Sequence, residues 1–190
     1  MLKEFRPTIL FLIKFFVIYF GFSALYGYFI SSYDTSDPPI TDPITHFITY
    51  NCTGTAALMG YEPSVIEDDH LNREALPEVT YDSVWFNDIY AVSIEEGCNG
   101  VNIMILFLAF IVAFGGKRLN MLIFIPSGIV FIHIANIARL MFLSLLNVEF
   151  GGRAFYFFHK YGFTAVIYLA VFLLWVLWVV RFSGKKKAQT

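Results

Sequence analysis

Hydrophobic residues are concentrated in four long stretches separated by polar segments, a pattern that predicts a multi-pass membrane protein. A helix needs about 20 mostly apolar residues to cross a bilayer. We therefore expect an α-helical integral membrane protein with about four transmembrane helices, and residues 1–190 are treated as a single membrane domain. The predicted spans cover residues 8–30, 98–114, 119–146 and 153–182.

The segment between the first two spans, residues 31–97, is predicted to contain its own small elements. Asp42 and Pro43 form a pair typical of a helix start, and apolar residues recur at helical spacing up to Gly60. This pattern predicts an amphipathic helix on the membrane surface, with a partial membrane span over residues 41–60 as the alternative.

The second half of this segment changes character. Residues 61–78 are acidic and lack periodicity, so we interpret them as a solvated loop. From Val79 to Ile94, aromatic and branched residues flank Asn87 and Asp88, which predicts a short β-hairpin.

The charge distribution predicts the orientation of the spans. Residues 31–97 contain thirteen acidic residues and one basic residue, whereas Lys117, Arg118 and the tail over residues 183–190 are basic. The positive-inside rule therefore makes 31–97 extracytoplasmic and both termini cytoplasmic. The first span exceeds the 7–15 apolar residues of a signal-peptide core, so we expect an uncleaved anchor. With 57% apolar and 15% charged residues, the composition excludes an ordinary soluble domain.

Two ionisable side chains interrupt the last two apolar stretches at similar distances from a predicted turn at residues 151–152. At ~1.5 Å per residue, Arg139 and His159 both lie roughly 10 Å below the outer membrane surface, which makes them potential partners. A charge inside the bilayer costs about 2.5–3.5 kcal/mol on insertion scales, so a functional role is favoured. Asn136 shares the helical face of Arg139. The alternative is that Arg139 snorkels to lipid phosphates.

Cys98 lies where the extracytoplasmic segment becomes helix. A helix N-terminus and a nearby arginine both stabilise a thiolate, which would make this thiol a nucleophile. The alternatives are a small buried side chain or a disulfide with Cys52. In the enzymatic interpretation His159 transfers the proton and Arg139 stabilises the oxyanion or the thiolate.

Three asparagines accompany these groups, and either they orient the reacting groups or they form hydrogen bonds between helices. They are Asn136, Asn99 and Asn102.

The other histidines show no metal-ligand spacing, and no His-Glu-x-x-His element or nucleotide-binding glycine loop occurs. We therefore expect no metal and no cofactor. The residues concerned are His46, His70 and His133, of which His133 is also an alternative to His159 as the functional imidazole.

The candidate residues occur in three ordered motifs: Glu95-Glu96-Gly97-Cys98-Asn99-Gly100, then Asn136-x-x-Arg139, then His159-x-x-Gly162. This set resembles the exosortase/archaeosortase family of membrane transpeptidases over about residues 40–182. The small size and the Cys-Asn-Gly sequence resemble the compact F-type exosortases of Bacteroidetes.

The resemblance implies a cysteine protease or transpeptidase of the bacterial cytoplasmic (inner) membrane, with its active site facing outward. Its partners would be membrane lipid and the C-terminal tails of exported proteins, each with a short motif, a transmembrane helix and a basic cluster; no nucleic acid is implied. Cys98 would attack the peptide bond to give a thioester, which water or an amine resolves.

Two other classes were compared with this one. A non-catalytic assembly factor or small transporter subunit would carry polar groups along a path through the bilayer, but here they gather at the outer end. A serine intramembrane protease lacks a Gly-x-Ser-x-Gly site, and Ser127 and Ser144 lie at opposite ends of the third span.

Overall fold

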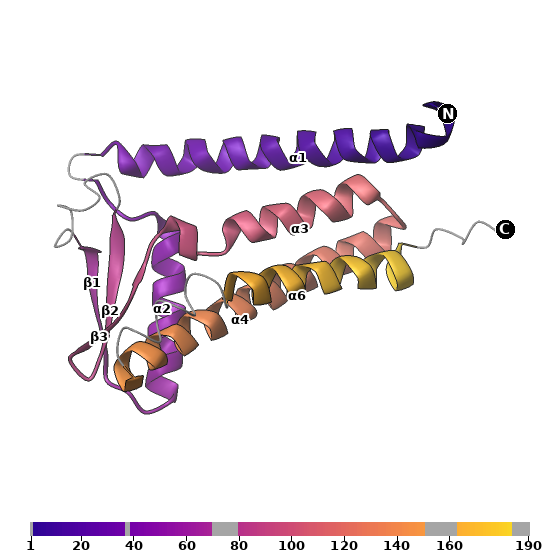
Figure 1. Ribbon diagram of the computed structural model, residues 1–190. Helices are drawn as coiled ribbons and strands as arrows, with labels where there is room; N and C mark the ends of the chain where they lie inside the picture. Colours follow the sequence, from indigo (N-terminus) through magenta and orange to yellow (C-terminus); the bar gives the residue numbers. More distant parts are fainter. Residues whose placement is uncertain (1, 37–38, 70–79, 151–162, 184–190) are drawn as a thin grey trace. The chain divides into compact units, whose positions relative to one another are not determined.

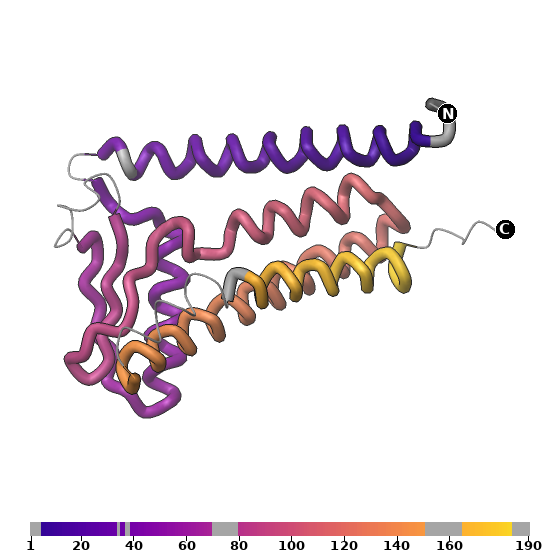
Figure 2. The backbone as a smooth tube through the Cα atoms, in the orientation of Figure 1, coloured from indigo at the N-terminus to yellow at the C-terminus, as the bar shows by residue number. Residues whose placement is uncertain are grey.

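A computed structural model describes residues 2–36, 39–69, 80–150 and 163–183 (Figures 1 and 2). It is mostly helical, with a small three-stranded sheet, as the hydrophobic pattern predicts. The helices are α1 (Leu2–Asp34), α2 (Pro43–Leu58), α3 (Val101–Phe114), α4 (Arg118–Phe150) and α6 (Phe163–Leu177). The strands are β1 (Pro63–Asp69), β2 (Tyr81–Phe86) and β3 (Ile89–Ile94), and the short helical turns are η1 (Glu96–Cys98) and η3 (Trp178–Phe182).

Three of the described helices are long and apolar enough to cross a membrane. They cover Phe5–Tyr33, Arg118–Phe150 and Ala165–Phe182, with mean hydropathies of 2.1, 2.0 and 2.3. The second predicted span corresponds to α3, whose 14 residues form a shorter apolar helix. The chain is therefore a helical membrane protein, while its orientation and the number of crossings remain predictions.

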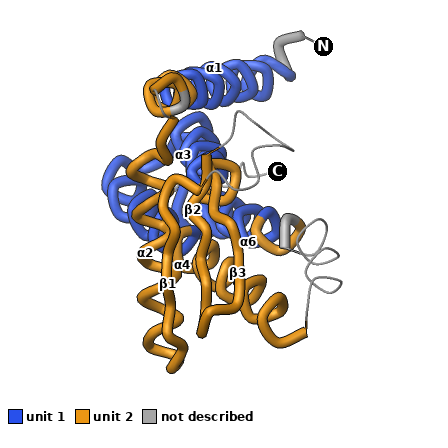
Figure 3. The backbone as a smooth tube through the Cα atoms, turned by 90° about the vertical axis from the view of Figure 1, so that its left-hand side faces the viewer, with its two compact units in different colours: residues 1–26, 101–132, 168–190 blue, residues 27–100, 133–167 orange. Residues whose placement is uncertain are grey.

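The chain divides into two compact units (Figure 3). Unit 1 comprises residues 1–26, 101–132 and 168–190, and unit 2 comprises residues 27–100 and 133–167. Within unit 1, α3 and α4 approach closely at Gly128, where an added Cβ would lie 2.2 Å from Cζ of Phe107. Any larger residue at this position would require the Phe107 ring to move.

Unit 2 contains an antiparallel sheet in the order β1-β2-β3. The predicted hairpin is confirmed: β2 and β3 pair through a two-residue turn at Asn87 and Asp88, both with positive φ, as in a type I′ turn. The loop predicted over 61–78 is wrong for Pro63–Asp69, which forms β1. The reason is that this edge strand has few apolar side chains, and it is stabilised by backbone pairing with β2.

The helix predicted between the first span and the hairpin is confirmed as α2. Asp42 is its N-cap and accepts hydrogen bonds from the backbone N–H groups of Ile44 (2.8 Å) and Thr45 (3.1 Å), and Pro43 occupies the first turn. With 16 residues, α2 is not one of the described helices that are long and apolar enough to cross a membrane. It packs on the sheet through a shared core that includes Ile48, Cys52, Val84 and Phe86.

Candidate functional site

Cys98 lies at the end of η1, the short turn that links the hairpin to α3. Its backbone N–H donates to the carbonyl oxygen of Glu95 at 2.8 Å, and its side chain is buried, with 7% of the residue exposed. Gly100 adopts φ +81°, a left-handed conformation that ends the turn before α3 begins at Val101. The predicted helix start at Cys98 is thus three residues too early, and the thiol does not occupy the first turn of α3.

Asn136 of α4 fixes the Cys98 turn from one side. Its Nδ2 donates a 2.9 Å hydrogen bond to the carbonyl oxygen of Cys98, and the asparagine is completely buried. The turn approaches so closely that a Cβ added at Gly100 would lie 3.2 Å from Cγ of Asn136. Two features therefore favour glycine at position 100: its positive φ and its close contact with Asn136.

Asn99 fixes the same turn to α2. Its Nδ2 donates to Oγ1 of Thr45 at 3.1 Å, and that hydroxyl donates to Oδ2 of Asp42 at 2.5 Å. All three side chains are buried. The N-cap of α2 is thereby connected to the residue that follows the candidate nucleophile.

Arg139 lies beside the Cys98 turn. Its Nη1 donates to Oδ1 of Asn136 at 3.5 Å, a long hydrogen bond, and its guanidinium also hydrogen-bonds the Cys98 side chain. Its Nε is buried and has no hydrogen-bond partner among the described residues. The structure thus brings Cys98, Asn136 and Arg139 together, and it leaves one buried N–H of the guanidinium available to a further acceptor.

Burial controls the acidity of the thiol. Removal from water raises the pKa of Cys98 above its usual value, the positive charge of Arg139 opposes this rise, and the carboxylate of Glu95 adds to it. The predicted influence of Arg139 on Cys98 is present, but burial outweighs it. Burial therefore disfavours the thiolate in the free protein, and a base would assist a nucleophilic reaction of this thiol.

The other candidate residues are not part of this arrangement in the described structure. His159 lies outside the described residues, so its approach to Arg139 remains a prediction. Asn102 is an exposed residue of α3 in unit 1. His133, the alternative imidazole, stacks on Phe47 with ring centroids 5.6 Å apart.

Cys52 is a free, completely buried thiol, and Cys98 is also free. The sulfur of Cys52 contacts Sδ of Met141 at 3.6 Å, and burial raises the pKa of Cys52 to about 12. Neither cysteine takes part in the disulfide that was the alternative to a nucleophilic role. Complete burial disfavours the thiolate of Cys52, which leaves Cys98 as the candidate nucleophile.

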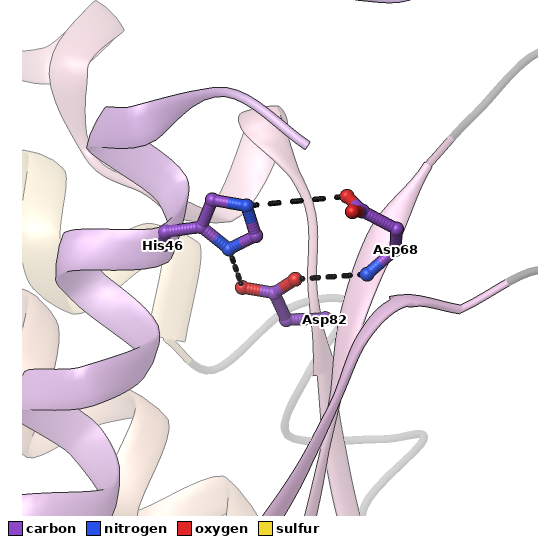
Figure 4. Close-up of side chains that lie close together, drawn as sticks. All are labelled: His46, Asp68 and Asp82. Atoms are coloured by element: carbon purple, nitrogen blue, oxygen red, sulfur yellow. Dashed lines mark hydrogen bonds and ion pairs between the residues drawn. The ribbon is translucent and has the colours of Figure 1, made fainter. Parts of the chain in front are cut away.

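A second polar group in unit 2 was missed by the sequence analysis. His46, Asp68 and Asp82 come together from α2, β1 and β2 (Figure 4). Their separation along the chain carries no motif, and Asp68 lies in the segment interpreted as a loop. Only the pairing of β1 with β2 could have indicated that these three side chains meet.

Unit 1 contains a cavity of about 480 Å³ that none of the candidate site residues lines. Its lining is mostly apolar and includes Phe11, Phe110 and Phe114 together with Lys14.

The fold and this geometry define a class: a helical membrane protein with a buried cysteine held against an arginine and an asparagine. Residues 5–177 match the model of the transmembrane exosortase family (Exosortase_EpsH). The chain therefore belongs to the transmembrane exosortases, and the resemblance found in the sequence motifs is confirmed. No curated protein and no solved structure matches the chain.

Proposed function

We propose that this protein is a membrane-embedded cysteine protease or transpeptidase that cleaves the C-terminal sorting signals of exported proteins. The observation that carries the proposal is the contact between the Cys98 side chain and the guanidinium of Arg139, which is itself oriented by Asn136. Membership of the exosortase family supports a membrane transpeptidase-like role in general.

In the proposed reaction, His159 accepts the thiol proton of Cys98 and the sulfur attacks the carbonyl carbon of the scissile peptide bond. The C–N bond then breaks, the departing amine takes up the proton, and the N-terminal part of the substrate remains on sulfur as a thioester. Water converts the thioester to an acid, or an amine converts it to an amide, and either route returns the thiol.

Arg139 would serve this reaction through its charge and its free donor. The charge favours the thiolate over the buried thiol, and the Nε–H that has no partner among the described residues can donate to the oxyanion of the tetrahedral intermediate. A permanently charged donor in a water-poor site stabilises developing negative charge more strongly than it would in water.

The proposed location is the bacterial inner membrane, with both termini cytoplasmic and the Cys98 site on the extracytoplasmic side. The substrate would present its transmembrane helix beside the enzyme and its basic cluster at the cytoplasmic face. The basic side chains of the enzyme lie on that same face in this topology, so charge attraction does not explain recognition of the tail.

The test is to replace Cys98, Arg139 and His159 singly by Ala and to follow cleavage of a co-expressed tail-anchored substrate by the mobility of its product. Cys98→Ala and Arg139→Ala should abolish cleavage while each variant is still recovered in the membrane fraction. Cys52→Ala is the matched control, and it should retain cleavage because its thiol takes no part. Normal cleavage by Cys98→Ala would leave the non-catalytic assembly factor or transporter subunit as the better description.

A further inference from the structure

Unit 2 contains a second site-like arrangement, formed by His46, Asp68 and Asp82 (Figure 4). The histidine lies on α2, Asp68 is near the end of β1, and Asp82 is near the start of β2. One nitrogen or oxygen from each residue lies within 4.8 Å of the other two. Three residues of types that can bind metals, from three separate elements, therefore lie close together.

The hydrogen bonds within the group select one nitrogen of the imidazole. Oδ2 of Asp82 lies 2.8 Å from Nδ1 of His46, and Asp82 is completely buried. When Nδ1–H donates to a carboxylate, the lone pair of a neutral imidazole is on Nε2. This carboxylate–histidine arrangement is the one that commonly orients a metal-binding histidine. Nε2 points toward Asp68 (Figure 4).

The gap between Nε2 and Asp68 has the size of a bridged contact. The distance from Nε2 to Oδ1 of Asp68 is 3.9 Å, beyond a hydrogen bond, whose limit is about 3.2 Å. Two ligands of one zinc ion, each bound at about 2.0–2.2 Å, are roughly 3.4 Å apart in tetrahedral geometry and about 4 Å when opposed. Oδ1 of Asp68 is held in place by the backbone N–H of Thr41 at 2.6 Å.

Charge and access also favour a cation here. The described part of residues 27–100 contains no lysine or arginine, so the imidazole is the basic group beside two carboxylates, one of them completely buried. Buried carboxylates require compensation by a cation or by hydrogen-bond donors. The side chains of His46 and Asp68 are 25% and 32% exposed, so an ion can enter from solvent and retain water ligands.

We propose that His46, Asp68 and Asp82 form a binding site for a divalent transition-metal ion such as zinc. His46 ligates the ion through Nε2 and Asp68 through its carboxylate, Asp82 holds Nδ1, and water completes the coordination. The bound ion links α2 to the edge of the sheet. Since α2 also carries Thr45, the acceptor of the Asn99 hydrogen bond, the metal stabilises the support of the Cys98 turn and takes no part in cleavage.

The test measures zinc binding by the full-length protein in detergent, after removal of metals with a chelator. Because zinc also binds thiolates, every protein compared carries Cys98→Ala. Equilibrium dialysis with zinc chloride should show one saturable site per chain, and zinc should raise the midpoint of thermal unfolding. His46→Ala and Asp68→Asn should remove the saturable site, and Asp82→Asn should weaken it by about 10–100-fold.

Asp88→Asn is the matched control, because this exposed acidic residue lies in the β2-β3 turn, and its zinc binding should equal that of the parent. Asp68→Asn preserves the size of a partly exposed side chain, so the test does not depend on the folding of the His46 variant. The proposal is overturned if the protein shows no saturable site when zinc is added up to about two equivalents per chain. It is equally overturned if Asp68→Asn and His46→Ala bind zinc as the parent does, which would leave a structural contact between α2 and the sheet as the role of the group.

Discussion

Removal of Arg139 should make the Cys98 thiol a much weaker acid. A positive charge within about 4–6 Å of an ionisable group typically changes its pKa by 1–3 units. Because Cys98 is 7% exposed, solvent screens this attraction only weakly. We therefore expect Arg139→Ala to raise the pKa of Cys98 further, because the substitution removes the positive charge that opposes the effect of burial.

The expected change in reactivity follows from two opposing effects. At a pH below the pKa, each unit of rise reduces the thiolate fraction about tenfold, while the more basic thiolate becomes only about threefold more nucleophilic. Alkylation of Cys98 by iodoacetamide at pH 8 should thus be several-fold slower in Arg139→Ala than in the parent. The rate is measured by mass spectrometry between pH 7 and 11, in protein that carries Cys52→Ala so that Cys98 is the sole thiol.

Two further variants separate charge from packing. Arg139→Lys keeps the positive charge and should give a smaller change than Arg139→Ala. Glu95→Gln removes the carboxylate that raises the pKa of Cys98, so it should shift the alkylation profile to lower pH. An Arg139→Ala profile with the same midpoint as the parent would refute the electrostatic coupling, whatever its effect on absolute rates.

Three substitutions test how the Cys98 turn is supported. Asn136→Ala removes the donor to the Cys98 carbonyl and should lower cleavage at least tenfold in the co-expression assay, with normal membrane insertion. Gly100→Ala combines a positive φ with a tight contact to Asn136, so it should lower the free energy of unfolding by about 1–2 kcal/mol and reduce cleavage. Asp42→Ala removes the N-cap of α2 and should lower the free energy of unfolding in detergent by about 0.5–2 kcal/mol. Unchanged unfolding midpoints for Gly100→Ala and Asp42→Ala would contradict the network described.

The sequence was sufficient for features that depend on local pattern. Hydropathy and length predict α1, α4 and α6, because a membrane helix satisfies its own backbone hydrogen bonds and needs only apolar side chains. The hairpin follows from the Asn87-Asp88 turn and the alternating residues on either side of it. The proximity of Asn136 and Arg139 follows from their three-residue spacing on one helix.

Features that depend on contacts between distant segments were not predictable in the same way. β1 was missed because its sequence is polar and it gains its stability from pairing with β2. The start of α3 was placed three residues early because Gly100 adopts a left-handed conformation that spacing does not reveal. The acidity of Cys98 depends on burial by packed elements, which a sequence pattern does not report.

The polar group around His46 shows the same limit. His46 and Asp82 are 36 residues apart and meet only because α2 packs on the sheet. No spacing rule for metal ligands covers such a pair, so the sequence analysis expected no metal. The convergence of His159 with Arg139 lies outside the described residues and remains a prediction.

The most direct measurement of the central claim is the isolation of a covalent adduct on Cys98. The protein is captured with a co-expressed substrate under acidic quench and examined by mass spectrometry with and without hydroxylamine, which cleaves thioesters. We predict an adduct on Cys98 whose mass equals the substrate without its membrane anchor, lost with hydroxylamine and absent from Cys98→Ala. Cleavage of the substrate by Cys98→Ala, or an adduct on any other residue, would contradict the role of this thiol as the nucleophile.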